Sequence, residues 1–565
     1  MHGNDSESHL RIDKECWLLV LWIGLIATAQ AAPAVNPAEQ DVIERQQKAL
    51  LEQAQQQRDD LQNTTDLPPL PQPISGTDDK TCHNVNRIAF LGAEHLSWSV
   101  KQKLVSSYQG RCLTLSRINN LVRETTNAYL QRGYVTSQAW LPEQDIAGGE
   151  LTVAVSEGRV EDISLDGKEM LALKMTFPGM VDNVLNLRDI EQGMEQLNRL
   201  PSQQVAIDIQ PGKRPGYSSV VLRRTSTRLP VSVSFGADNG GQKSTGTGQM
   251  NAGVVLDNPL RLADQWSLSA SRDSGFRHDR RSRSLNGGVT LPYGYWLFSY
   301  QAAWNDFYQH IPLQDVRYRY QGSAVIQRLG VNRTLLRDGR QKLALDMGLS
   351  RRRTENRLAG QRLTNSSVTV ASLSAGLNYS RTLGGGYLTL NPTVSHGLRG
   401  LGATRDAPAF PDAAHGEFRK FNLSASYFYP LTPSLYYLSS AYGQTSADNL
   451  YAGERLSVGG QYSVRGFKEQ YLTGNRGAYW RNELNWQVGT VPAAGEVSLT
   501  GALDGGWLRE EAHRVEGGSV AGAALGLTMN SAWFNQSFTV GKPLLHPASL
   551  QPDRWVAYWQ ATVTL

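Results

Sequence analysis

The sequence predicts a membrane-spanning antiparallel β-barrel of about 16 strands, preceded by two small α/β domains and an N-terminal helix. Three observations lead to this fold class. From about Leu229 to the C-terminal Leu565, apolar and polar residues alternate with a period of two, which places successive side chains on opposite faces of a strand. After residue 31, no stretch approaches the roughly 18 consecutive apolar residues of a membrane-spanning helix. Between residues 80 and 226, strand and helix patterns follow one plan twice.

Residues 1–31 are interpreted as a secretory signal peptide. A short apolar run at residues 17–29 leads into Ala29-Gln30-Ala31, the small-residue pattern of a cleavage site. A membrane anchor is the alternative, but the run is short and no stop-transfer segment follows it. Cys16 precedes the run and is expected to be removed with the signal peptide.

Residues 32–66 are predicted to contain one solitary helix. Residues 37–62 are rich in strong helix formers, and their apolar stripe is narrow: Val42, Ile43, Leu50, Leu51, Ala54 and Leu61. Residues 67–79 begin with four prolines in seven positions, which predicts a stiff, extended linker. A coiled coil or a disordered tail is the alternative interpretation of the helical segment.

The next region is divided into two α/β domains, residues 80–157 and residues 158–228. In the first, strand patterns near Ile88 and at 151–155 enclose helical patterns at 96–108 and 115–132. In the second, a strand at 160–165 and a helix at 187–200 precede strands at 205–209 and 219–222. The repetition of one plan predicts tandem domains.

Two cysteines remain after removal of the signal peptide, Cys82 and Cys112. Two cysteines in an exported chain predict one disulfide, and closing a loop of about 30 residues contributes roughly 3 to 4 kcal/mol in the chain-entropy model. Free thiols or a metal-binding pair are the alternatives. Both are disfavoured, because no set of His and Cys residues has the spacing of zinc ligands.

Residues 229–565 are predicted to form the barrel. Val231, Val233 and Phe235 alternate with small and polar residues, and the pattern recurs at 421–427, 484–488 and 555–565. Dividing these 337 residues by about 21 for a strand and its connection gives about 16 strands, an even number as bacterial barrels require. A closed barrel leaves no unpaired strand edge in lipid. A soluble β-sandwich is the alternative.

One short stretch late in the barrel region does not have a strand pattern. Residues 457–467 combine Gly459 and Gly460 with the tetrad Val464-Arg465-Gly466-Phe467, which predicts a tight loop that presents one cation. Further along the chain, Asp504 has the parity of the polar residues in an alternating strand and is therefore predicted on the lumenal face. Arg465 and Asp504 can meet only if the loop folds into the barrel.

Composition and motifs disfavour several function classes. The net charge of +5 is small and spread along the chain, without a basic cluster interleaved with aromatic residues, so no nucleic-acid partner is expected. No serine-hydrolase Gly-x-Ser-x-Gly, zinc-protease His-Glu-x-x-His or phosphate-binding loop motif is present. We therefore expect no catalytic residues, no enzyme activity, no cofactor and no metal site.

The loop tetrad, followed by Gly474-Asn475-Arg476-Gly477 and Arg481-Asn482-Glu483-Leu484, resembles the sixth-loop region of two-partner secretion (type Vb) transporters of the haemolysin secretion/activation family. These outer-membrane pores carry periplasmic POTRA (polypeptide-transport-associated) domains, and residues 132–142 and 157–160 resemble such a domain. The resemblance implies that Arg465 pairs with Asp504 on a nearby barrel strand. It also implies that residues 37–62 form a plug helix in the barrel lumen at rest.

The resemblance further implies a function. The chain is expected to recognise one large exoprotein, a haemolysin, an adhesin or a contact-dependent inhibition toxin, and to translocate it from the periplasm to the cell surface. The expected partners are this unfolded exoprotein and outer-membrane lipid, and the pore is expected to be a monomer. The α/β domains and the N-terminal helix region are expected on the periplasmic side of the outer membrane.

Two other functions are weighed against this one. A factor that assembles outer-membrane proteins shares the POTRA and loop features, but the helix, the proline-rich linker and the presence of only two POTRA-like units disfavour it. A passive porin needs neither the POTRA domains nor the arginine motif. The α/β domains themselves are expected to bind unfolded polypeptide along an exposed sheet edge, and rigid spacers are the alternative.

Overall fold

The computed structural model describes residues 37–65, 67–73, 81–313, 316–406, 413–492, 494–511 and 515–565. The predicted signal peptide and residues 74–79 of the predicted linker lie outside the described residues. Within the described ranges, no helix combines the length and the apolar composition needed to cross a membrane.

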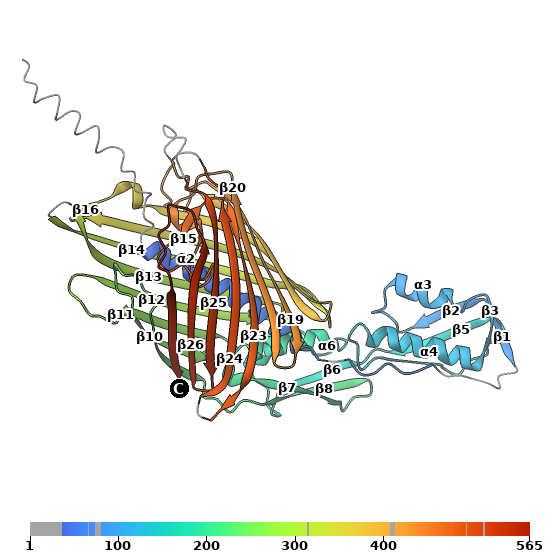
Figure 1. Cartoon of the computed structure of the whole chain (residues 1–565). Helices are drawn as coiled ribbons and strands as arrows, with labels where there is room; N and C mark the ends of the chain where they lie inside the picture. The colour runs from blue at the N-terminus through green and yellow to red at the C-terminus, as the bar shows by residue number, and fades with distance from the viewer. Residues whose placement is uncertain are drawn as a thin grey trace, which may run out of the picture.

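The chain forms a β-barrel with one helix inside it and two α/β domains extending from one end (Figure 1). This arrangement confirms the predicted fold class. Helix α2 (Pro37–Gln62) passes through the interior of the barrel, and the two α/β domains follow one another away from the barrel. Because helix α2 precedes both domains in sequence, the chain leaves the lumen, runs along the domains and returns to build the barrel.

The first α/β domain has a three-stranded sheet in the order β2-β5-β4, in which β2 is parallel and β4 antiparallel to β5. Its elements are β1 (Cys82–Val85), β2 (Arg87–Leu91), α3 (Trp98–Ser106), β3 (Arg111–Thr114), α4 (Leu115–Leu130), β4 (Gln138–Trp140) and β5 (Glu150–Ser156). Buried Leu121, Tyr129 and Leu151 contribute to one core between the helices and the sheet. Helix α3 begins later than the sequence pattern predicts, because Ser97 has an extended backbone and occupies the N-cap.

The second α/β domain repeats this plan with the sheet order β6-β8-β7, again with the first strand parallel to the last. Its elements are β6 (Arg159–Leu165), α5 (Leu171–Thr176), α6 (Leu187–Asn198), the 3-10 turn η2 (Pro201–Gln203), β7 (Val205–Pro211) and β8 (Tyr217–Arg224). The sequence pattern did not reveal the short helix α5. Buried Ile190, Leu197 and Leu222 belong to a core separate from that of the first domain.

The barrel is closed and contains sixteen strands among the described residues. They are β9 (Val231–Asp238), β10 (Gln249–Asp257), β11 (Gln265–Asp273), β12 (Arg281–Tyr293), β13 (Trp296–Leu313), β14 (Val316–Arg337), β15 (Gln341–Leu358), β17 (Thr369–Leu383), β18 (Gly386–Leu398), β19 (Arg419–Thr432), β20 (Leu435–Ser446), β23 (Gly477–Val491), β24 (Gly495–Leu508), β25 (Gly518–Asn530), β26 (Phe534–Leu545) and β27 (Val556–Thr564). The two-residue β16 (Gln361–Arg362) only extends the end of β15. Strand β27 pairs with β9, from Gln560 opposite Asp238 to Thr564 opposite Ser234, and so closes the barrel.

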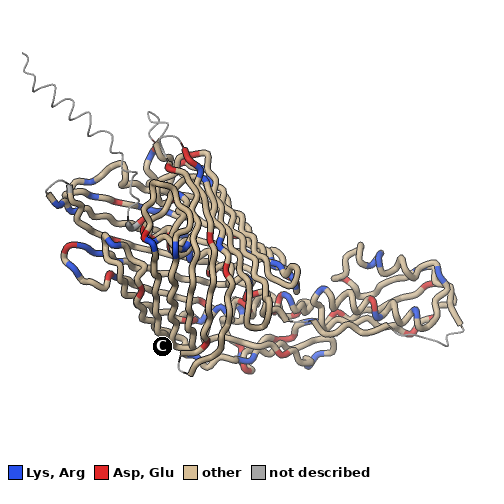
Figure 2. The backbone as a smooth tube through the Cα atoms, in the orientation of Figure 1, with Lys and Arg blue, Asp and Glu red and all other residues tan. Residues whose placement is uncertain are grey.

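The two faces of the barrel wall differ as the period-two pattern predicts. On β24 and β25, Leu499, Leu503 and Leu525 are 41%, 62% and 73% exposed and point outward. The strands that face the viewer in Figure 2 carry few charged residues, whereas charges are frequent on the α/β domains. Inward-pointing side chains around the lumen are mostly Ser, Thr, Asn and Gln. The outer face is therefore suited to lipid and the inner face to water or a polar occupant.

Candidate functional site: the loop and the helix inside the barrel

The connection between β20 and β23, residues 447–476, folds into the lumen; we call it the inward loop. It contains the 3-10 turn η4 (Ala452–Glu454) and the short paired strands β21 (Leu456–Val458) and β22 (Leu472–Gly474). Its apolar side chains form a small core with the inner wall, which comprises Leu456, Val458, Val464, Phe467 and Leu472 of the loop and Tyr442, Tyr479, Leu508, Val520 and Leu550. An apolar core inside a polar lumen fixes the loop in place.

Arg465 and Asp504 are in direct contact in the structure. The Arg465 side chain donates two parallel hydrogen bonds to the carboxylate, from Nε to Oδ2 over 2.6 Å and from Nη2 to Oδ1 over 2.7 Å. The backbone N–H of Arg465 donates a third to Oδ2, over 3.0 Å. The Asp504 side chain is fully buried and the Arg465 side chain is 7% exposed. In this bidentate geometry, shielded from water, the planar guanidinium and the carboxylate fix each other's orientation.

Two more charged residues extend this pair, and neither was predicted to contribute to it. Glu483 on β23 lies 3.0 Å from Arg465 Nη1 and accepts a hydrogen bond from Arg481 over 2.8 Å. Arg481 also donates to the backbone carbonyl of Gln461 in the inward loop. Their orientation could have been predicted from the sequence, because Arg481 and Glu483 have the same parity on a strand and both therefore point into the lumen.

Glycines shape the turns of the inward loop. Gly459, Gly460 and Gly466 have φ angles of +120°, +121° and +104°, a region that side chains with a Cβ disfavour. Phe467, which completes the tetrad, is fully buried, and its carbonyl accepts a hydrogen bond from Tyr558 on β27. The loop is thus joined to two strands of the barrel wall, β24 through Asp504 and β27 through Tyr558.

Helix α2 occupies the lumen beside the inward loop; we call it the plug helix. Gln47 donates to the carbonyl of Ser457 in the loop over 2.8 Å, and Leu50 packs on the loop core. On the opposite side the helix contacts the barrel wall through amides: Gln53 donates to Asn378 over 2.9 Å and Gln57 to Asn391 over 3.1 Å. The plug helix is therefore held largely by polar contacts.

The C-terminal end of the plug helix meets both the barrel and the second α/β domain in one ionic cluster. Lys342 on β15 pairs with Asp60 of the plug helix over 3.0 Å and also with Glu195 of α6. Arg337, at the end of β14, pairs with Glu195 as well. Burial raises the pKa of Glu195, but Lys342 and Arg337 outweigh this effect and hold the pKa below its usual range. Glu195 is therefore an ionised link between domain and barrel.

The chain just after the plug helix is also fastened to α6. The backbone N–H of Thr65 donates to Glu191 over 2.9 Å, and the Arg188 side chain bridges Glu191 and the carbonyl of Thr65. Any movement of α6 relative to the barrel therefore acts on the segment that leaves the lumen.

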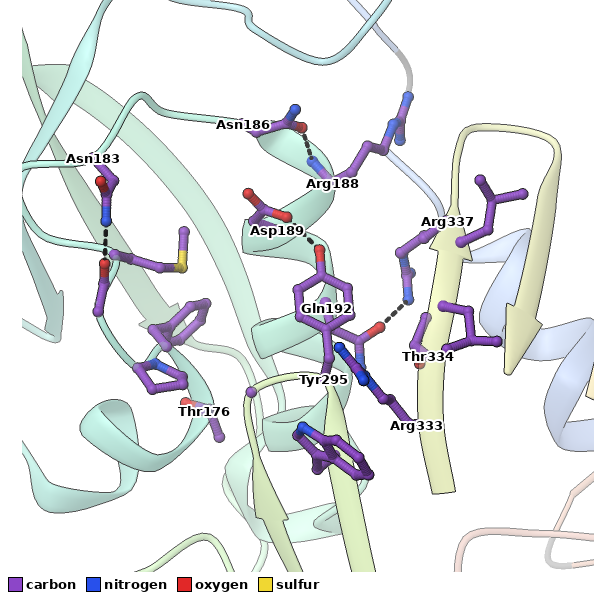
Figure 3. A pocket seen from close by; sticks show the side chains of 18 of the residues that line it. Thr176, Asn183, Asn186, Arg188, Asp189, Gln192, Tyr295, Arg333, Thr334 and Arg337 are labelled. Atoms are coloured by element: carbon purple, nitrogen blue, oxygen red, sulfur yellow. Dashed lines mark hydrogen bonds between the residues drawn. The ribbon is translucent and has the colours of Figure 1, made fainter. Parts of the chain in front are cut away.

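A cavity of about 810 Å³ lies where the α/β domains meet two turns of the barrel (Figure 3), and His95, Arg132 and Tyr134 of the first domain contribute to its lining. Tyr295, from the turn between β12 and β13, donates a hydrogen bond to Asp189 of α6. Arg337 donates to Gln192 over 3.4 Å. Beside this cavity the domain rests on the barrel through further polar contacts, among them hydrogen bonds of Arg199 to Thr290 and of Ser202 to Asp257.

Cys82 and Cys112 form a disulfide in the structure. It joins β1 and β3, whose Cα atoms at these two residues are 5.3 Å apart, across a sequence separation of 30. The described residues contain no group of three or more His, Cys, Asp or Glu side chains placed to hold a metal ion.

Three protein-family models match successive parts of the chain. Residues 83–158 match the ShlB-type POTRA domain and residues 159–211 match a further POTRA domain. Residues 216–529 match the haemolysin secretion/activation protein family ShlB/FhaC/HecB. The two α/β domains are therefore POTRA domains.

Named relatives match over most of the chain. It is 42% identical to the outer membrane transporter CdiB of Dickeya dadantii (strain 3937) over 534 residues, which are 94% of this chain and 95% of the relative. It is 32% identical to the hemolysin transporter protein ShlB of Serratia marcescens over 386 residues, 67% and 68% of the two chains.

The structure is similar to that of CdiB from Escherichia coli, with a TM-score of 0.91 and 41% identity over 95% of this chain and 100% of that one. CdiB from Acinetobacter baumannii has the same fold, with a TM-score of 0.77 and 23% identity. The family model, the relatives and the fold agree, and the chain belongs to the haemolysin secretion/activation family of outer-membrane two-partner secretion transporters.

Proposed function

We propose that this chain exports a single large exoprotein, a contact-dependent inhibition toxin, across the outer membrane. The observation that carries the proposal is the 42% identity to an outer membrane transporter CdiB along nearly the whole of both chains. The plug helix and inward loop support it, because together they obstruct a lumen that a passive channel would leave open. We propose that the pore works as a monomer; within the described residues, the closed barrel has no strand edge to which a second copy could add.

The exoprotein first docks, unfolded, on the α/β domains at residues 80–226. Strand β7 supports this step: it is an edge strand of seven residues that pairs only with β8 within its sheet. An edge strand offers unpaired backbone groups that an extended polypeptide can bind whatever its side chains are.

The plug helix then leaves the lumen. The hydrogen bonds of Gln53 and Gln57 to the barrel wall support this step, because a neutral hydrogen bond that water can replace contributes only about 0.5 to 1.5 kcal/mol. A helix anchored by a broad apolar face would be much costlier to release. The polar character of the plug helix is thus suited to a removable occupant.

The inward loop stays docked and shapes the path. The pair of Arg465 and Asp504, with Glu483 beside it, holds the loop against β24. No nucleotide takes part, and folding of the exported chain outside the cell supplies the direction of transport. The disulfide between Cys82 and Cys112 stabilises the first α/β domain while it carries unfolded cargo.

A secretion assay tests the proposal. The gene is deleted, and each large exported protein encoded beside it is quantified in the medium and on the cell surface by mass spectrometry. Loss of one such protein, restored when this chain is returned, supports a dedicated transporter and identifies its cargo. A joint decrease of many outer-membrane proteins, with no exoprotein selectively lost, would instead identify an assembly factor.

A further inference from the structure

The tip of the inward loop lies directly on the barrel wall, at a place where three glycines from different segments meet. They are Gly466 of the loop, Gly522 of β25 and Gly541 of β26. Gly522 is opposite Asp504 in the β24–β25 pairing, so it faces the lumen beside the arginine's partner. Glycine allows one backbone to approach another closely, because it has no Cβ. The alternating pattern of a strand does not by itself require a glycine at these positions.

Each of these glycines leaves space that another backbone fills. A Cβ on Gly522 would overlap the carbonyl oxygen of Arg465. A Cβ on Gly541 would lie 2.7 Å from the nitrogen of Gly466, and a Cβ on Gly466 would lie 2.6 Å from the carbonyl oxygen of Lys542. In all three cases the obstacle is backbone, which cannot turn aside as a flexible side chain does.

The wall is irregular at the same point. The pairing of β25 with β26 shifts register between Ala521 and Gly522, and Gly522 lies opposite Pro543, which has no N–H for the ladder. A β-bulge bends its strand and increases the local twist. The irregularity and the glycines thus coincide with the contact made by residues 465 and 466 of the loop.

We propose that Gly522 and Gly541 form a seat that fixes the position of the loop tip and thereby places Arg465 on Asp504. The charge pair alone does not fix this position, because an arginine side chain is long and reaches a carboxylate from many backbone positions. By contrast, the loop backbone that packs against Gly522 and Gly541 can fit there in only one position. This inference rests on the proposed function only where it bears on secretion; the docking of the loop is measured separately.

The test substitutes Gly522→Ala and compares it with Gly501→Ala. Gly501 lies on the adjacent strand β24, and a Cβ there would meet no described heavy atom within 4 Å. The reporter is Ser463→Cys, a near-isosteric change at a fully buried loop position; the two native cysteines of the described chain are joined in the disulfide and do not react. Maleimide labelling of the purified protein measures how often the loop is released.

We expect Gly522→Ala to increase the labelling rate about tenfold or more, as overpacking by one methyl against backbone implies, while Gly501→Ala leaves the rate unchanged. Heat-modifiable migration in a gel shows that the barrel is closed. Should the barrel of the Gly522→Ala variant fail to close, Gly541→Ala gives the same test, because its added Cβ overlaps the loop backbone less severely. Labelling at the wild-type rate in a closed barrel would overturn the seat.

A double variant separates positioning from a general effect on the wall. If the seat acts in part by placing Arg465, then Gly522→Ala increases the labelling rate by a smaller factor in the Arg465→Ala background than in the wild type, because coupled positions are not additive. Fully additive rates would overturn the inference. If the loop is released in Gly522→Ala but secretion stays normal, the seat is supported, and it is the role of the docked loop in secretion that fails.

Discussion

Arg465 and Asp504 form a buried, bidentate ion pair across 39 residues of sequence, and the backbone N–H of Arg465 adds a third hydrogen bond to the same carboxylate. The arginine comes from a loop and the aspartate from a strand. The pair therefore exists only in the conformation in which the loop lies inside the barrel.

Replacement of Arg465 by alanine tests this pair. Removing one partner of a buried ion pair costs about 3 to 5 kcal/mol, which here disfavours the docked loop and not the barrel strands. We expect Arg465→Ala to assemble normally and to lose most secretion, and Arg465→Lys to be intermediate because lysine lacks the planar fork. Arg509→Ala, at an exposed position after β24, is the control. Normal export by Arg465→Ala would refute a role for the pair.

Replacement of Asp60 by asparagine tests what holds the plug helix. The variant removes the ion pair with Lys342 but leaves Lys342 paired with Glu195. A hydrogen bond to a charged group contributes about 1.5 to 3 kcal/mol, so the unplugged state should increase about tenfold or more. Conductance of the purified pore in planar bilayers measures this population.

The neighbouring Asp59→Asn is a matched control, because it makes the same charge change one residue away. Asp59 pairs with Arg58 on the same helix and is 40% exposed. Equal conductance of the two variants would show that the Asp60–Lys342 contact does not retain the helix.

Removal of the disulfide should weaken the first α/β domain alone. Reduction, or the double substitution Cys82→Ser with Cys112→Ser, is expected to lower the free energy of unfolding of this domain by about 3 to 4 kcal/mol. Limited proteolysis of the full chain, with and without dithiothreitol, detects early cleavage between residues 81 and 157. A reducing agent that has the same effect on the double-serine variant would contradict this assignment.

Acid should destabilise the same domain through Glu157. Burial raises the pKa of this carboxyl, but hydrogen bonds from the His95 backbone, from Tyr129 and from the His95 ring outweigh burial and lower the pKa below its ordinary value of 4.5. A carboxyl whose pKa is lowered by folding stabilises the folded state at pH values above the pKa of the unfolded chain. This contribution is lost as the pH falls through the pKa of the folded state. Glu157→Gln should therefore flatten the change in proteolytic stability below about pH 4.5.

The measurement compares the rate of limited proteolysis of the domain in the wild type and in Glu157→Gln across pH 3.5 to 7 at constant ionic strength (about 0.1 M). The expected difference between the two proteins is largest at neutral pH and shrinks on acidification. A difference that stays constant over this range would mean that the ionised carboxylate is not the stabilising form.

The sequence by itself determined the barrel and the parity of its wall. Period-two alternation is a local property, so Leu499 and Leu503 could be placed outside and Asp504 inside without coordinates. The tandem α/β domains and the solitary polar helix were predicted for the same reason, because their patterns lie within short segments. The tetrad at 464–467 identified the loop because an arginine between a valine and a glycine does not fit a strand.

Only the tertiary structure decided which segments meet inside the lumen. The contacts of Gln47 with Ser457, of Asp60 with Lys342 and of Gly522 with the loop backbone join residues separated by 57 to 410 positions. Neither Lys342 nor Gly522 departs from its strand pattern, so the sequence gives no local sign of its partner. Such contacts depend on the path of the chain through a closed barrel, and that path is fixed by strand pairing around the whole circumference.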